Sequence, residues 1–235
     1  HLKTGSVRRL IVGEPIGVFY GYRFDGIFQN EEECKQQTSS ASPIGVGLRR
    51  YKDLNGDGKV DAANDREILG DANPKFFGGL TNTFAYKGFE LNVFLQYSYG
   101  NKILNYNAME LENPTGGQNA YADMVNRWTP ENPSNIYPKA TTNRALLVSD
   151  RFIEDGSYLK LKTLSLSYSF PKINLKHIQG LRLYVTGQNL LTWTKYRGYD
   201  PEVSYRGAST LEAGEDFGGY PQSRTFMFGI KLDIK

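Results

Sequence analysis

The sequence predicts an all-β fold, and within that class a segment of an antiparallel transmembrane β-barrel with long extracellular loops. Three observations lead to this class. Apolar and polar residues alternate along several stretches, these stretches run to about a dozen residues, and short connections alternate with long ones. The count of such stretches is about seven or eight, which suits part of a large barrel.

The clearest strand runs from Phe89 to Gly100, with the sequence FELNVFLQYSYG. Apolar and aromatic side chains fall on one face of this stretch and polar ones on the other, and only Phe94 interrupts the pattern. The stretch Ala120–Trp128 is the best candidate for a short helix. Further strands are expected at Phe76–Tyr86, Thr163–Phe170, Gly180–Trp193 and Arg224–Lys235, with weaker candidates at Gly17–Phe28 and Leu48–Asp53.

The connections between these strands are of two kinds. Tyr86–Gly88 and Pro171–Gly180 are short, whereas Asn101–Asp150 and Thr194–Ser223 are long, polar and rich in Gly, Pro and Asn. Transmembrane barrels of bacteria have short periplasmic turns and long extracellular loops. Tracing the strands back from a periplasmic C-terminus, we expect the short turns in the periplasm and the long connections outside the cell, together with Asp53–Asp65.

Composition and motifs exclude several classes of function. The net charge is only +3, with 28 basic and 25 acidic residues spread along the chain, so we expect no nucleic-acid partner. Cys34 has no second cysteine with which to form an internal disulfide. The motifs G-x-S-x-G and H-E-x-x-H do not occur, and His1 and His177 have no partners at useful spacing. We therefore expect no catalytic residues and no enzyme activity.

The stretch DLNGDGKVDAAND, residues 53–65, is similar to the first half of an EF-hand calcium loop. Calcium takes six to eight oxygen ligands, and oxygen-bearing side chains at positions one, three and five precede Gly58, which permits the sharp turn. Position twelve is Asn64 rather than an acid, so the second half is irregular. A solvated cluster of Asn-Gly and Asp-Gly turns is the alternative. The predicted ligands of one Ca2+ are Asp53, Asn55, Asp57, the backbone carbonyl of Lys59, Asp61 and Asp65.

Several aromatic residues could stack on sugars or anchor the protein at a membrane interface. Aromatic girdles flank the apolar band of transmembrane barrels, so anchoring is the favoured interpretation. These residues are Trp128, Trp193, Tyr196, Tyr199 and Tyr205.

A soluble β-sandwich is the main alternative to the membrane class, because its strands alternate as well. It would be a calcium-stabilised module that binds carbohydrate through the same loop and aromatic residues. Sandwich strands are typically shorter, with about 5–6 residues, so the observed lengths favour the membrane.

Five stretches are specific in combination: GEPIGVFYGYRFDGIFQN, DLNGDGKVDAANDREILGDANPKFFGGLTNTFAYKGFELNVFLQYSYG, NRWTPENP, FIEDGSYLKLKTLSLSYSF and GQNLLTWTKYRGYDPEV. In this order they resemble the C-terminal part of the SusC/RagA-type TonB-dependent outer-membrane transporters. The resemblance extends from about Gly13 to the end of the chain.

The resemblance implies a multi-pass protein of the outer membrane of Gram-negative bacteria, with residues 1–235 as the C-terminal portion of its barrel. Outer-membrane transporters with a plugged lumen have about 22 strands, and family members carry an N-terminal plug domain and a TonB box that are absent here. The family imports glycans or peptides. The implied partners are the remaining barrel and plug, TonB, a SusD-like surface lipoprotein, the substrate and outer-membrane lipid.

Overall fold

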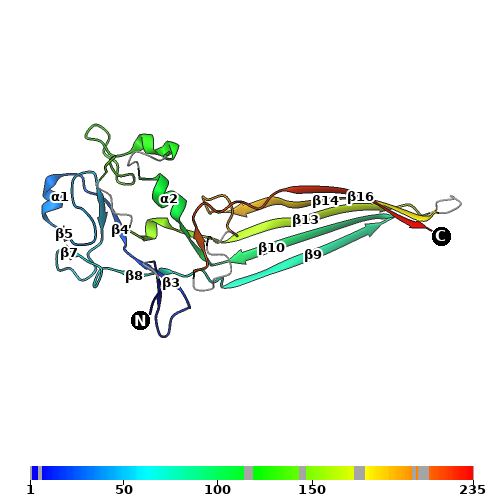
Figure 1. The fold of residues 1–235 in the computed structure, drawn as a ribbon, viewed down its shortest axis with the longest axis horizontal. Coiled ribbons are helices and arrows are strands. Elements are labelled where there is room, and N and C mark those ends of the chain that lie inside the picture. Colours follow the sequence, from blue (N-terminus) through cyan, green and yellow to red (C-terminus); the bar gives the residue numbers. More distant parts are fainter. Residues whose placement is uncertain are drawn as a thin grey trace. The chain divides into compact units, whose positions relative to one another are not determined.

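The computed structural model divides the chain into two compact units, which we call the wall and the loop unit (Figure 1). The wall consists of Pro74–Asn101, Gly156–Pro201 and Tyr220–Lys235. The loop unit consists of His1–Asn73, Lys102–Asp155 and Glu202–Gly219. Within these units the structure describes residues 2–4, 7–113, 119–142, 147–171, 178–202, 205 and 212–234, so His1 and His177 lie outside the described residues.

The wall is one antiparallel sheet of five long strands in the order β16-β14-β13-β10-β9 (Figure 1). Neighbours in the sheet are also neighbours in the order of these strands along the chain, as in an up-and-down barrel. The strands are β9 (Phe76–Tyr86), β10 (Phe89–Tyr99), β13 (Tyr158–Ser169), β14 (Ile178–Thr194) and β16 (Thr225–Ile234).

The segment before β9 and the two long connections, which follow β10 and β14, all join the wall at the same end, which we call the loop end. Phe76 pairs with Tyr99 there, and Tyr158 pairs with Thr194. The opposite end, the turn end, carries the short connections. The hairpin residues Lys87 and Gly88 there have φ angles of 46° and 88°, as a two-residue type I′ turn requires. The predicted alternation of short and long connections is therefore present, although residues 172–177 of the second turn lie outside the described residues.

The loop unit contains short strands that the sequence assigns to the barrel. The stretches Gly17–Phe28 and Leu48–Asp53 do form strands, but each has only three or four residues and lies outside the wall. The expectation of seven or eight wall strands is therefore wrong for the described residues, which place five there. The strands of the loop unit are β1 (Leu2–Thr4), β2 (Arg8–Leu10), β3 (Val18–Gly21), β4 (Phe24–Ile27), β5 (Thr38–Ser39), β6 (Arg49–Tyr51), β7 (Lys59–Val60), β8 (Glu67–Gly70), β11 (Lys102–Asn105), β12 (Ile153–Asp155) and β15 (Glu215–Asp216).

The helices are short and belong to the loop unit. The predicted helix at Ala120–Trp128 is present as a 3-10 helix. No helix in the described part of the chain is long and apolar enough to cross a membrane. The helices are α1 (Glu31–Lys35), α2 (Tyr106–Leu111) and the 3-10 helices η1 (Ala122–Asn126) and η2 (Asp150–Phe152).

One apolar core joins the separate segments of the loop unit. Phe19 comes from the segment before β9, and Leu104 and Phe152 come from the connection between β10 and β13, yet the three pack in one buried cluster. Arg8 links the segment before β9 to the connection that follows β14, because its Nε donates to a carboxylate oxygen of Glu215 at 2.8 Å. Both side chains are almost fully buried, and the guanidinium also lies 4.2 Å from the centre of the Phe19 ring. The long connections of the wall thus fold into a shared structure.

Candidate functional site

One face of the wall is apolar across all five strands. Directly paired residues share a face, so Leu91 on β10 lies between Phe84 on β9 and Leu166 on β13. Phe84 is 60% exposed, and Ile230 on β16 is 68% exposed. A soluble sandwich would cover this face with a second sheet, so the exposure favours the membrane class. This apolar face includes Leu80, Leu91, Val93, Leu95, Leu159, Leu161, Leu164, Leu166, Leu183, Val185, Phe226, Phe228, Ile230 and Leu232.

Aromatic rings gather at both ends of the apolar face. At the loop end, the rings of Phe76 and Tyr99 stack with their centroids 4.8 Å apart. At the turn end, the ring of Tyr168 lies 4.5 Å from that of Phe89 and 4.8 Å from that of Phe170. Two such girdles with aliphatic residues between them are typical of a barrel in a membrane, where aromatic rings lie at the headgroup level.

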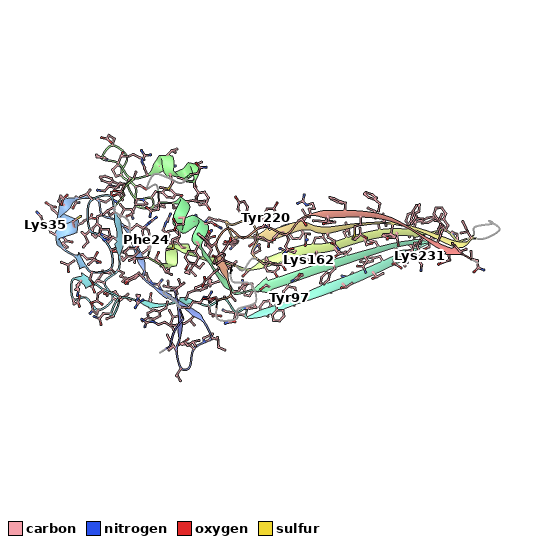
Figure 2. The ribbon with its side chains drawn as sticks, viewed as in Figure 1. Phe24, Lys35, Tyr97, Lys162, Tyr220 and Lys231 are labelled. Atoms are coloured by element: carbon pink, nitrogen blue, oxygen red, sulfur yellow. The ribbon has the colours of Figure 1, made fainter. Side chains whose placement is uncertain are left out.

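The length of the strands fits a bilayer. Strand β9 has 11 residues, which span about 34 Å at about 3.4 Å per residue. A tilt of about 40° reduces this to a height of about 26 Å, close to the apolar band of about 25 Å in outer-membrane barrels. In Figure 2, Tyr97 and Lys231 mark the loop end and the turn end of the wall.

The opposite face of the wall is polar and holds ion pairs, among them Arg182 with Glu90 and Lys160 with Asp200. Arg182 donates from Nη2 to Glu90 at 2.5 Å and to Ser167 at 2.7 Å. Near the loop end, Lys160 Nζ donates to Asp200 Oδ1 at 2.5 Å, and the two side chains are only 2% and 7% exposed. Outer-membrane barrels have polar interiors, so this polar face corresponds to the lumen side.

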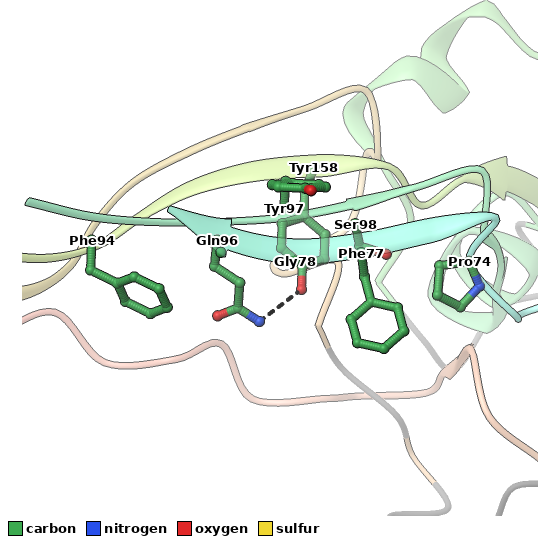
Figure 3. A pocket seen from close by; sticks show the side chains of 9 residues that line it. Pro74, Phe77, Gly78, Phe94, Gln96, Tyr97, Ser98 and Tyr158 are labelled. Atoms are coloured by element: carbon green, nitrogen blue, oxygen red, sulfur yellow. Dashed lines mark hydrogen bonds between the residues drawn. The ribbon is translucent and has the colours of Figure 1, made fainter. Parts of the chain in front are cut away.

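A pocket of about 650 Å³ lies on the polar face near the loop end (Figure 3). Phe94, which interrupts the alternation in the sequence, belongs to its lining, and the Phe94 ring lies over Gly79, where a Cβ would come within 2.6 Å of it. Gln96 Nε2 donates to Tyr158 Oη at 3.3 Å across the pocket. In the described part of the chain, the lining residues are Pro74, Phe77, Gly78, Gly79, Phe94, Gln96, Tyr97, Ser98 and Tyr158.

The predicted calcium loop is closed by its own hydrogen bonds. The two carboxylate oxygens of Asp53 accept from the backbone amides of Gly56 and Gly58 at 2.7 and 2.6 Å. Asp57 accepts from the amide of Lys59 at 2.8 Å. These bonds fix the tight turns of the first half of the loop.

The second half of the loop is organised by Asp61 and Asp65. Asp61 accepts from the backbone amides of Asn64 and Ala63, and these bonds lower the pKa of its carboxyl group. Asp65 is fully buried and accepts from the amides of Leu54 at 2.8 Å and Asp61 at 2.7 Å. Asp65 therefore ties the two ends of the loop together.

The donor types of this loop suit Ca2+, but hydrogen bonds set their arrangement. Asn55, for example, donates from its side-chain amide to Asp57 at 2.9 Å. Among the described residues, no three His, Cys, Asp or Glu side chains gather as they would around a metal ion. An ionised carboxylate has about four acceptor sites, so amide bonds leave capacity for a cation.

The aromatic residues singled out from the sequence are spread over several environments. Trp193 pairs with Leu159, so it lies on the apolar face at the loop end, and it is 50% exposed. Tyr196 is buried, and Trp128 donates from Nε1 to Gln29 in the loop unit. The sequence interpretation missed most residues of the aromatic girdles. One pattern in the sequence could have predicted them, an aromatic residue at each end of an alternating stretch. They are Phe76, Tyr97, Tyr99, Phe89, Tyr168 and Phe170.

Comparisons with known proteins agree with this two-faced wall. No protein-family model matches the chain. TonB-dependent receptors P3 and P26 of Formosa agariphila are 40% and 33% identical to it over 99% and 98% of its length. The TonB-dependent receptor SusC of Bacteroides thetaiotaomicron is 28% identical over 78% of this chain. A chain in the structure of the RagAB peptide transporter superposes over 99% of this chain with a TM-score of 0.77, at 24% identity.

The chain spans a quarter or less of the length of these proteins: 23% of receptor P3, 24% of receptor P26, 17% of SusC and 24% of the RagAB chain. The curated relatives are receptors by name, not enzymes. The exposed apolar face, the polar opposite face and the likeness in fold identify the wall as part of a transmembrane β-barrel. The chain therefore belongs to the SusC/RagA-type family of TonB-dependent receptors.

Proposed function

We propose that this chain forms part of the barrel wall and the extracellular loops of an outer-membrane receptor that imports glycans or peptides with energy delivered through TonB. The observation that carries the proposal is the wall itself, whose apolar face has two aromatic girdles and whose other face is polar. One solved relative in fold is named a peptide importer. A SusD-like surface lipoprotein is the partner proposed to cover the extracellular side.

Nutrient uptake tests this proposal directly. Cells that carry the complete gene product are compared with cells that lack it and with cells that lack TonB, on defined glycans and peptides as sole nutrients. We expect growth on at least one of these nutrients to require both proteins. Growth that depends on the gene product but not on TonB would contradict the import mechanism.

The orientation of the wall gives a second test. In a Cys34→Ser background, Tyr220→Cys and Lys87→Cys place single thiols at the loop end and the turn end, both at exposed positions. We expect a membrane-impermeant maleimide to label Tyr220→Cys on intact cells and Lys87→Cys only after the cells are opened. The reverse pattern would place the long connections in the periplasm and overturn the proposed topology.

We also propose that the loop at residues 53–65 binds one Ca2+ through Asp53, Asn55, Asp57, Asp61, Asp65 and the carbonyl of Lys59. The cation would brace the loop unit and take no part in transport. Calcium is expected to raise the melting temperature of the complete gene product, and Asp57→Ala should lose this rise, because a carboxylate ligand is removed. Glu14→Ala, which removes an exposed carboxylate elsewhere in the loop unit, is the control. Identical melting curves with calcium and with chelator would count against the site.

A further inference from the structure

Two phenylalanines interrupt the polar face of the wall at the pocket near its loop end. Phe77 and Phe94 share this face with Thr81 and Asn92, because alternate residues of one strand point the same way. The side chain of Phe77 is 75% exposed, although its neighbour Phe76 already supplies the apolar face. Aromatic rings exposed together on an otherwise polar surface are typical of places that contact a ligand or another part of a protein.

The polar groups around these rings are neutral. Gln96 contributes an amide, and Tyr158 and Ser98 contribute hydroxyl groups, whereas none of the nine lining residues that the structure describes carries a charge. The charge that lies beside Gln96 in the sheet belongs to Lys160, whose ammonium group is held by Asp200. Among the described residues, a charged ligand group would lose its hydration here without gaining an opposite charge, so this part of the lining suits a neutral ligand.

We propose that this pocket is a subsite for one neutral sugar ring of an imported glycan. The C–H face of a pyranose packs against aromatic rings, while the hydroxyl groups at its edge match the amide of Gln96 and the hydroxyl of Tyr158. The volume of about 650 Å³ lies within the range of small-molecule sites, about 300–1,000 Å³. This inference deepens the proposed import function and rests on it for the source of the glycan.

Phe77 is the residue on which the test depends. Phe94 also covers the backbone of Gly79, so its removal would disturb the wall as well as the pocket. Phe77 is mostly exposed, and its truncation should leave the fold intact. Phe76 is a matched control, because it is the adjacent residue, is 54% exposed and lies on the opposite face.

The experiment measures binding of neutral hexasaccharides of glucose, xylose, mannose and galactose to the detergent-purified complete gene product by calorimetry. We expect at least one of them to bind and Phe77→Ala to weaken it about tenfold, the loss that one ring contact supplies. Phe76→Ala should bind as the wild type does. Both variants should melt within the error of the wild-type temperature or slightly below it.

The subsite would be overturned if no neutral hexasaccharide bound, or if the two variants bound with equal affinity. It would also be overturned if binding of the charged glycan hexagalacturonate or of the peptide tetra-alanine depended on Phe77. A large fall in melting temperature for Phe77→Ala alone would show that another part of the gene product covers the ring, and this too would overturn it. TonB-dependent growth that is unchanged in Phe77→Ala would remove the subsite and leave the import function standing. Binding that depends on Phe77, together with uptake that does not depend on TonB, would support the subsite and contradict the import function.

Discussion

Replacing Val93 with arginine is expected to prevent stable assembly of the wall in the membrane. Val93 lies in the middle of β10 on the apolar face, between the two aromatic girdles. An arginine facing lipid near the midplane costs about 2–4 kcal/mol, which lowers the equilibrium ratio of folded to unfolded protein by about 30-fold to nearly 1,000-fold. Urea titration of the complete gene product in lipid vesicles measures this loss, and the amount in outer-membrane fractions of cells should fall with it.

The control for Val93→Arg is the same substitution one residue earlier. Asn92 points to the polar face, where its side-chain amide donates to Thr83 Oγ1 at 2.9 Å. Asn92→Arg should therefore cost only the hydrogen bond, about 1 kcal/mol. Equal losses for the two variants would mean that the apolar face does not contact lipid.

Replacing Lys160 with methionine is expected to destabilise the wall by about 3–5 kcal/mol, because it leaves the carboxylate of Asp200 buried without its lysine. The carboxylate accepts from Lys160 Nζ and, through its other oxygen, from the backbone amide of Gln222 at 3.2 Å. It thereby holds the chain that follows β14 and the chain that precedes β16 against β13. Thermal unfolding of the complete gene product measures the change, and proteolysis should become faster in these two segments.

Two further variants separate charge from packing at this ion pair. Lys231→Met removes an exposed lysine from the same sheet and should change stability by less than about 0.5 kcal/mol. The double variant Lys160→Met/Asp200→Leu should recover most of the loss, because a buried pair can be replaced by apolar residues at little cost. A single Lys160→Met variant as stable as the wild type would contradict the role of the pair.

The wall strands were predictable because their alternation is a local property of the sequence. The predicted strand Phe76–Tyr86 matches β9, and Gly180–Trp193 differs from β14 by only a few residues. Strand β13 begins five residues before the predicted Thr163, because a bulge between Leu161 and Thr163 shifts the register. The bulge keeps Leu159 on the apolar face although the alternation in the sequence changes phase there.

The loop unit and the pocket were not predictable from local pattern. Arg8 and Glu215 are separated by 207 residues, so the local sequence around either residue does not predict their ion pair. Phe77, Phe94 and Tyr158 lie on three strands, and only the register of those strands brings them together. The calcium loop is intermediate, since its turns follow from its Asp and Gly residues while metal binding depends on groups converging in space.

The division into a wall and a loop unit implies that the two parts diversify by different routes. A single inserted residue in β10 would exchange the side chains that face lipid with those that face the lumen, unless a bulge such as the one in β13 absorbs it. The wall is therefore confined to substitutions that preserve polarity. The connections at the loop end can lengthen wherever they reach the surface of their own folded unit. Related proteins can thus differ in the surfaces of their loop units while the strands of their walls stay the same in length and pattern.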